Sequence, residues 1–136
     1  MPTTPMPAAV LDLLRRPNPA VMATVAADGR PVTVATWYLL EDDGRVLLGL
    51  DATRARIKHM RADPRISLTV LAEDDWYTHV SLQGRVVEWR DDEDLSDIDR
   101  LARQYGRDQY PKRDRPRVSA WIEVDHCHIW GKPSRS

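Results

Sequence analysis

The chain has 136 residues, of which 42% are hydrophobic and 30% charged, a balance typical of a folded globular protein that excludes a disordered chain. Its 20 basic and 21 acidic residues give a net charge of −1, which argues against a general nucleic-acid binder because a phosphate backbone favours a large positive surplus. A single cysteine excludes an internal disulfide framework, and no stretch approaches the ~20 apolar residues that would span a membrane.

The first part of the chain predicts one helix and three strands. Apolar spacing indicates an amphipathic helix over residues 7–16, which Pro17 and Pro19 end. Alternating apolar residues then predict three strands, at residues 21–26, 32–40 and 45–50. Tight turns at residues 28–29 and 41–44 join these strands. Three strands joined so tightly predict an antiparallel meander.

The second part predicts a basic helix over residues 53–62, with Thr53 as its N-cap and an end before Pro64. Further on we expect two strands at residues 66–71 and 76–89, followed by a helix at residues 91–105. A polar basic loop at residues 107–116 then leads to a last strand at residues 118–130. The whole pattern predicts a mainly β protein with flanking helices, built as a closed or nearly closed antiparallel barrel of six strands.

Several common functional motifs are absent from the sequence. It has no G-x-G-x-x-G after a strand, no P-loop and no G-x-S-x-G elbow, which argues against a Rossmann dinucleotide fold, a kinase and a serine hydrolase. We expect one domain over residues 1–136. Without a charged segment before the first apolar run, we also expect a cytoplasmic location.

The densest positive run surrounds the predicted basic helix and includes Arg54, Arg56 and Lys58. A helix start and planar guanidinium groups favour an anion such as phosphate, but a solvated basic face is equally compatible with the run. In a regular helix Arg54 and Lys58 share a face from which Arg56 points away. All three meet one ligand only if the chain is not yet helical at Arg54, or if the ligand carries several separated anions.

Aromatic residues supply further candidates. Trp76 and Tyr77, with Gln83 as a polar group beyond them, could form a platform for a planar ring, or a barrel rim or dimer contact. Tyr38, late in the second predicted strand, is a candidate proton donor. His126 and His128 share a strand face from which Cys127 points away, so we expect strand packing there and no metal site.

The order and spacing of these segments resemble a known family, the pyridoxamine 5'-phosphate oxidase-like, FMN-binding split β-barrel superfamily. The resemblance covers residues 8–131, and the segments that carry it are Asp28-Gly29-Arg30-Pro31, Thr53-Arg54-Ala55-Arg56, Ala62-Asp63-Pro64-Arg65-Ile66-Ser67-Leu68 and Ile129-Trp130-Gly131. The Arg-x-Arg pair and the Asp-Asp-Trp-Tyr sequence at residues 74–77 are similar to the actinobacterial branch of coenzyme F420-dependent reductases.

This resemblance implies a split-barrel homodimer with a cofactor at its interface. It implies that Arg54, Arg56 and Lys58 hold the phosphate and anionic tail of the cofactor. The other implied contacts line the ring (Thr33, Val34, Ala35, Thr36), surround the ribityl chain (Leu50, Asp51, Ala52, Thr53) or come from the partner subunit (Trp76, Tyr77, Gln83).

The resemblance also implies an enzyme that transfers a hydride from reduced deazaflavin, coenzyme F420, to a small electron-poor substrate such as an enone or lactone. An FMN-dependent oxidoreductase, a non-catalytic cofactor carrier and a purely structural dimer remain alternatives. The segment 131–136 lacks the basic residues that hold the substrate phosphate in relatives that oxidise pyridoxamine phosphate, so we do not expect that reaction.

Overall fold

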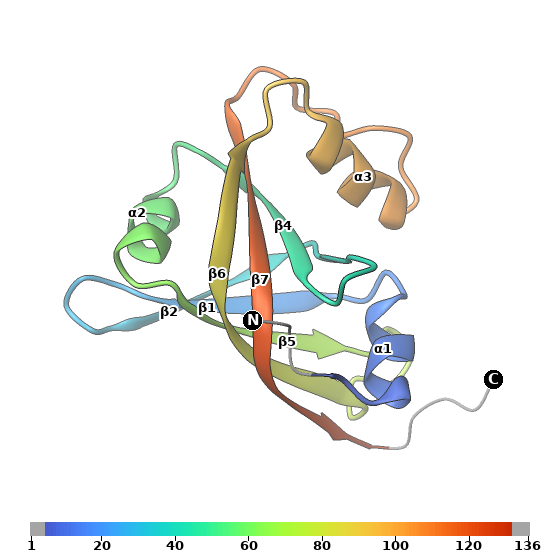
Figure 1. The fold of residues 1–136 in the computed structure, drawn as a ribbon. Coiled ribbons are helices and arrows are strands. Elements are labelled where there is room, and N and C mark those ends of the chain that lie inside the picture. Colours follow the sequence, from blue (N-terminus) through green and yellow to red (C-terminus); the bar gives the residue numbers. More distant parts are fainter. Residues whose placement is uncertain (1–4, 132–136) are drawn as a thin grey trace.

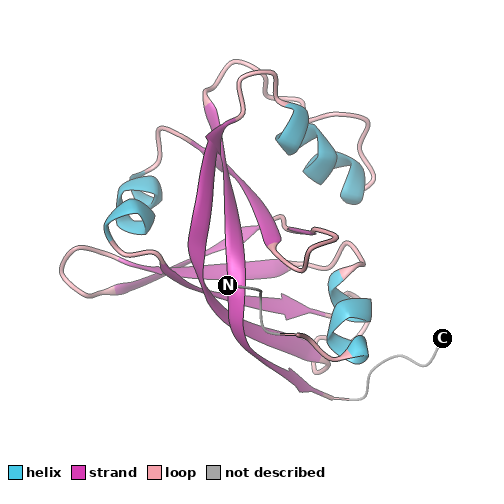
Figure 2. Ribbon diagram, in the orientation of Figure 1, coloured by secondary structure: helices cyan, strands magenta, loops and turns pink. Residues whose placement is uncertain are grey.

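The structure, a computed structural model, describes residues 5–131 of the chain. It contains three helices and seven strands (Figures 1 and 2), in the order α1 (Ala8–Leu14), β1 (Ala20–Val25), β2 (Pro31–Thr36), β3 (Leu39–Leu40), β4 (Val46–Asp51), α2 (Ala55–Ala62), β5 (Arg65–Leu71), β6 (His79–Asp91), α3 (Ser96–Gln104) and β7 (Arg117–Trp130). No helix within the described residues is long and apolar enough to cross a membrane.

The strands form one antiparallel sheet in the order β2-β1-β5-β6-β7-β4-β3. The sheet curls but does not close, since β2 and β3 remain as its two edges. The mainly β, antiparallel prediction is confirmed, whereas the prediction of six strands is wrong. The predicted meander is also wrong, because β4 pairs with β3 and β7 and not with β2.

The seventh strand arises because the predicted strand 32–40 bends at Trp37 and Tyr38. β2 ends at Thr36 on one edge of the sheet and β3 begins at Leu39 on the other. Three residue steps bring the Cα atoms of these two ends within about 11 Å of each other. Trp37 and Tyr38 therefore carry the chain across the opening between the two edges, which is the split of the barrel.

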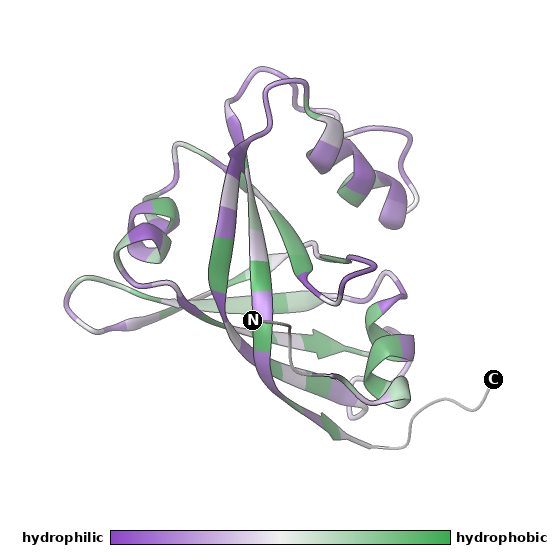
Figure 3. Ribbon diagram, viewed as in Figure 1, coloured by the Kyte–Doolittle hydropathy of each residue, from purple (hydrophilic) through white to green (hydrophobic). Residues whose placement is uncertain are grey.

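Burial on both faces of β4 explains where the two apolar clusters lie. Val46, Leu48 and Leu50 point into the barrel core, and Leu47 packs outward against Ile98 of α3. Figure 3 shows the hydrophobic residues concentrated on the strands and α1, with more hydrophilic residues on α3 and the segment before β7. The outer cluster fixes α3 beside the split.

Several predicted boundaries differ from the observed ones. Thr53 is not the N-cap of α2, because its backbone N–H and hydroxyl both donate to Oδ1 of Asp51, and the helix begins one residue later with Arg54 as its cap. Trp76 and Tyr77 lie in the turn before β6 and not on the strand. The expectation for the tail concerns residues that, apart from Gly131, lie outside the described range.

Candidate functional site

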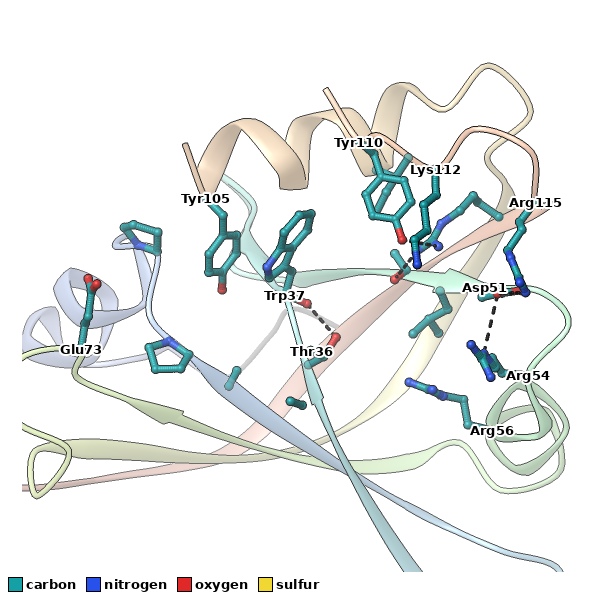
Figure 4. Close-up of a pocket in the computed structure, with 18 residues that line it drawn as sticks. Thr36, Trp37, Asp51, Arg54, Arg56, Glu73, Tyr105, Tyr110, Lys112 and Arg115 are labelled. Carbon is teal, nitrogen blue, oxygen red and sulfur yellow. Dashed lines mark hydrogen bonds and ion pairs between the residues drawn. The ribbon is translucent and has the colours of Figure 1, made fainter. Parts of the chain in front are cut away.

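A cavity of about 750 Å³ lies at the split of the barrel, beneath α3 and the segment that follows it (Figure 4). Its walls come from the loop before β1, the ends of β2 and β4, the start of α2, and residues 105–117. The lining residues used below are Ala35, Thr36, Trp37, Leu50, Asp51, Arg54, Arg56, Glu73, Tyr105, Tyr110, Lys112, Arg115 and Arg117.

One end of this pocket is strongly basic. Arg54 and Arg56 reach it from the start of α2, and Lys112, Arg115 and Arg117 from the opposite wall. Within residues 5–131 Arg56 and Lys112 have no ion-pair partner. Burial, followed by repulsion from Arg54, lowers the pKa of Arg56. Uncompensated cations in a concave site attract an anion, because its charge relieves their repulsion.

Asp51 is the carboxylate at this basic end. Its Oδ2 lies 3.3 Å from Nη1 of Arg115 and 3.7 Å from Nε of Arg54, so it links the two basic walls. Hydrogen bonds from Thr53 hold the pKa of Asp51 below its ordinary value. The carboxylate is therefore ionised at neutral pH.

Arg117 is fixed beneath the segment that carries Lys112. Its Nη2 donates to the Gly49 carbonyl at 3.0 Å, and its guanidinium carbon lies 4.7 Å from the Tyr110 ring centroid. Its Nε is buried without a hydrogen-bond partner among the described residues. A buried donor without a partner is costly and is typical of a site that a ligand completes.

The other end of the pocket is aromatic. Trp37 stacks on Tyr105 with ring centroids 5.2 Å apart, and Tyr110 meets Trp37 edge-on at 6.0 Å. The Tyr105 hydroxyl donates to the Asn18 carbonyl at 2.7 Å, and burial raises the pKa of Tyr105 to about 12. Figure 4 shows these rings on the same wall, with Glu73 beyond them. Such a wall suits a planar ring.

The structure brings together six of the residues predicted to contact a cofactor, namely Ala35, Thr36, Leu50, Asp51, Arg54 and Arg56. Arg54 precedes the helix, which is the condition under which the sequence allowed Arg54 and Arg56 to meet one ligand. Lys58 does not line the pocket.

The remaining predicted contacts lie outside the pocket of the single chain. They are Thr33 and Val34 on β2, Ala52 and Thr53 in the turn before α2, Trp76 and Tyr77 before β6, and Gln83 on β6. The Gln83 side chain donates to the Ser81 hydroxyl at 2.7 Å. That Trp76, Tyr77 and Gln83 contact the cofactor of a partner subunit stays a prediction.

Tyr38 is buried in the core and does not line the pocket. Its hydroxyl donates to the Arg16 carbonyl at 2.7 Å, and burial raises the pKa of Tyr38 above its ordinary value. This hydroxyl is therefore engaged in holding the split together, away from the pocket.

The sequence places Trp37, late in the second predicted strand, beside a ligand at the barrel edge, and Trp37 does line the pocket. The sequence analysis missed Tyr105, Tyr110, Lys112, Arg115 and Arg117 as pocket residues. The available signal was the basic loop 107–116, whose positive density is similar to that of the α2 region. The position of this loop depends on Asp99, which accepts hydrogen bonds from the Tyr110 backbone N–H and from Arg113.

The histidines near the end of β7 lie far along the strand from this loop. His126 and His128 are both exposed, as their shared strand face predicts, and His128 meets Trp130 with ring centroids 4.1 Å apart. The described residues contain no group of three or more potential metal ligands placed to hold an ion.

Comparison with solved structures shows the same fold. A protein described as an F420 reductase matches with a TM-score of 0.82 and 22% identity over 90% of this chain and 98% of that chain. A conserved hypothetical protein from Mycobacterium tuberculosis matches with a TM-score of 0.73 and 23% identity, over 99% of this chain and 93% of that chain. General Stress Protein 26 from Bacillus anthracis matches with a TM-score of 0.65 and 16% identity, over 90% of this chain and 91% of that chain.

No protein of curated function matches the chain in sequence. The profile of the pyridoxamine 5'-phosphate oxidase family, by contrast, matches residues 6–131, which is nearly the whole chain. The split sheet, the pocket at the split and this match lead to one conclusion: the chain belongs to the pyridoxamine 5'-phosphate oxidase family.

Proposed function

We propose that this protein binds coenzyme F420 in the pocket at the split and uses it to reduce a small electron-poor substrate such as an enone or lactone. The observation that carries the proposal is the division of one pocket into a basic end and an aromatic end. A cofactor with a planar ring and an anionic extension is complementary to both ends at once.

The number of cations favours the deazaflavin over FMN. FMN presents a single terminal phosphate, whereas coenzyme F420 carries a phosphodiester followed by carboxylates. Arg54 and Arg56 on one wall, and Lys112 and Arg115 on the other, offer positive charge to more than one anionic group. Arginine forks bind phosphate in two-point contacts, and lysine adds a point charge for a carboxylate.

The aromatic end would hold the ring. The stacked pair Trp37 and Tyr105 provides an aromatic wall, and Ala35 leaves space beside the β2 backbone because its side chain is small. The bound cofactor supplies the hydride chemistry, and the protein supplies position and partial exclusion of water. We propose that solvent supplies the proton that completes the reduced product. The Tyr38 hydroxyl is buried and already donates its hydrogen bond to the Arg16 carbonyl.

We also propose that two chains form a homodimer in which Trp76, Tyr77 and Gln83 approach the partner's cofactor. Trp76 is 75% exposed and Tyr77 60%, which is unusual for large aromatic residues on a monomer's surface. The β1–β2 hairpin projects from the rest of the chain in Figure 1, and Thr33 and Ala35 on β2 are exposed. These surfaces offer apolar area to a second copy.

Binding to the apoprotein tests the cofactor assignment. Coenzyme F420 and FMN are titrated separately while tryptophan quenching and cofactor fluorescence are recorded. We expect micromolar or tighter binding of coenzyme F420, and a loss of about tenfold or more in Arg56→Ala because a charge-assisted contact disappears. Lys58→Ala is the matched control, since Lys58 lies on the same helix but outside the pocket.

Two other results of this titration would change the cofactor assignment. Tighter binding of FMN would assign the protein to FMN-dependent chemistry, and binding of neither cofactor would overturn the proposal. Reduction of a panel of enones and lactones by the loaded protein then separates an enzyme from a carrier, because a carrier binds the cofactor tightly but reduces nothing.

A further inference from the structure

Asp51 is an unexpected residue in a pocket proposed to bind anions. Its side chain is only 11% exposed, and it lies between the two basic walls. Oδ1 accepts two hydrogen bonds from Thr53, at 2.9 Å from the backbone nitrogen and 2.6 Å from the hydroxyl. The hydroxyl and backbone contacts hold Oδ1 in place, which leaves Oδ2 facing the guanidinium groups of Arg54 and Arg115.

A carboxylate fixed in this position repels a bound anion in proportion to the anion's charge. A phosphodiester carries one negative charge at every pH near neutrality. A phosphate monoester gains its second charge at a pKa of about 6. At short range in a partly buried site, each added negative charge near a carboxylate costs free energy. The same carboxylate therefore penalises the monoester more than the diester.

We propose that Asp51 is a specificity-determining residue that favours a singly charged phosphodiester over a doubly charged phosphate monoester at the basic end of the pocket. Coenzyme F420 carries the first group and FMN the second, so Asp51 selects between the two cofactors. This inference rests on the proposed function, because it requires a flavin-type cofactor in this pocket.

The first test uses the unmodified protein and two ligands with the same ring, FMN and its methyl phosphodiester. Affinities are measured between pH 5.5 and 7.5. The charged groups that face Asp51 are Arg54, Arg56, Lys112, Arg115 and Arg117, none of a type that titrates in this range. Because the charge of the diester is constant over this pH range, any change in its affinity reflects titration of the protein itself. Because the surrounding cations attract each added negative charge and Asp51 opposes it, we expect the affinity for FMN relative to the diester to rise less steeply with pH in the unmodified protein than in Asp51→Asn.

The second test replaces the charge while keeping the shape. Asp51→Asn retains an oxygen that accepts from Thr53, so the turn before α2 is preserved. At pH 7.5 we expect the affinity for FMN relative to its methyl diester to rise about tenfold in this variant. We expect the preference for coenzyme F420 over FMN to fall by a similar factor.

Asp63→Asn is the matched control. Asp63 also accepts a hydrogen bond from the backbone two residues later, and it pairs with Arg65 at 2.6 Å, but it lies outside the pocket. Its replacement should leave both ratios unchanged.

The results separate this inference from the proposed function. An equal change for FMN and its diester in Asp51→Asn, or the same pH dependence of their affinity ratio in the variant and the unmodified protein, overturns the role of Asp51 and leaves cofactor binding intact. Failure of coenzyme F420, FMN and the diester to bind overturns the proposed function, and the inference with it.

Discussion

Single residues at the split show how burial decides what a reactive side chain does. Tyr38 is fully buried, and its hydroxyl donates to the carbonyl of Arg16, which lies in the loop between α1 and β1. The neighbouring Trp37 points to the pocket side and stacks on Tyr105. These two consecutive residues therefore have different roles. Tyr38 joins the barrel to the loop after α1, and Trp37 contributes to the aromatic wall of the pocket.

Tyr38→Phe removes the hydroxyl and leaves the Arg16 carbonyl without this partner. We expect the free energy of unfolding to fall by about 1–3 kcal/mol, the cost of an unsatisfied polar group at a buried site. Cofactor affinity should remain within about twofold, because Tyr38 does not line the pocket. Thermal and urea unfolding measure the first effect and titration the second.

Tyr77→Phe is the control, since the ring proposed for the interface is kept and the hydroxyl that is lost has no hydrogen bond among the described residues, so stability should be nearly unaltered. Loss of substrate reduction in Tyr38→Phe at full cofactor binding would contradict the assignment of a structural role.

Among the elements, α3 is joined to strands β6 and β7 of the sheet through the buried carboxylate of Asp97. Asp97, with its side chain 3% exposed, accepts hydrogen bonds from Arg90 of β6 at 2.6 Å and from Ser119 of β7 at 2.7 Å. Arg100 adds a contact at 3.2 Å and also pairs with Glu41. This network holds the helix whose following segment carries Tyr110 and Lys112 over the pocket.

Acid should weaken this network in a defined direction. Burial alone would raise the pKa of Asp97, but the hydrogen bonds from Arg90, Ser119 and Arg100 together lower it. Because the pKa in the folded chain lies below the unfolded value of about 3.9, the ionised carboxylate stabilises the fold above that pH. The contribution is lost as the pH falls through the folded value.

Asp97→Asn therefore should cost about 2 kcal/mol of unfolding free energy at pH 7, and the difference from the unmodified protein should shrink below pH 4. Urea unfolding at a series of pH values measures it. Asp108→Asn, at an exposed position after α3, serves as the control. A difference that stays constant down to pH 2.5 would show that the charge of Asp97 is not what matters.

At the scale of the whole molecule, a nearly neutral chain places five cations, Arg54, Arg56, Lys112, Arg115 and Arg117, around one end of a pocket and exposes large aromatic residues at other sites. The large apolar residues with the most exposed surface are Trp76 and Tyr77, with Val87 and Trp130 less exposed at 42% each. Trp76 and Tyr77 are adjacent in the sequence, and neighbouring exposed aromatic residues of this kind favour an association surface.

We expect sedimentation equilibrium to give a mass of about twice 15.6 kDa at micromolar concentration. The double change Trp76→Ser with Tyr77→Ser should weaken cofactor binding although neither side chain lines the pocket of its own chain. Val87→Ser on β6 provides a comparison at another exposed apolar position. A monomer that binds the cofactor with full affinity would contradict the homodimer.

Local patterns predicted most of the strands to within one or two residues. The alternation in β1 and β5 reflects a sheet with one buried face, and the glycine turn after β1 sets its hairpin. Pro64 ends α2 because the residue before a proline disfavours helical backbone, and this boundary is also found. Such rules act between residues that are close in the sequence.

The sequence by itself determined the antiparallel, mainly β architecture and the resemblance to the family that the profile confirms, and it predicted an anion site at Arg54 and Arg56. Only the tertiary structure decided that the second strand breaks at Trp37, that Tyr38 is buried and that the loop 107–116 faces α2 across a pocket. The physical reason is that these features depend on contacts between distant segments. Asp99 holding Arg113 and Asp51 linking Arg54 to Arg115 have no periodic signal in the sequence.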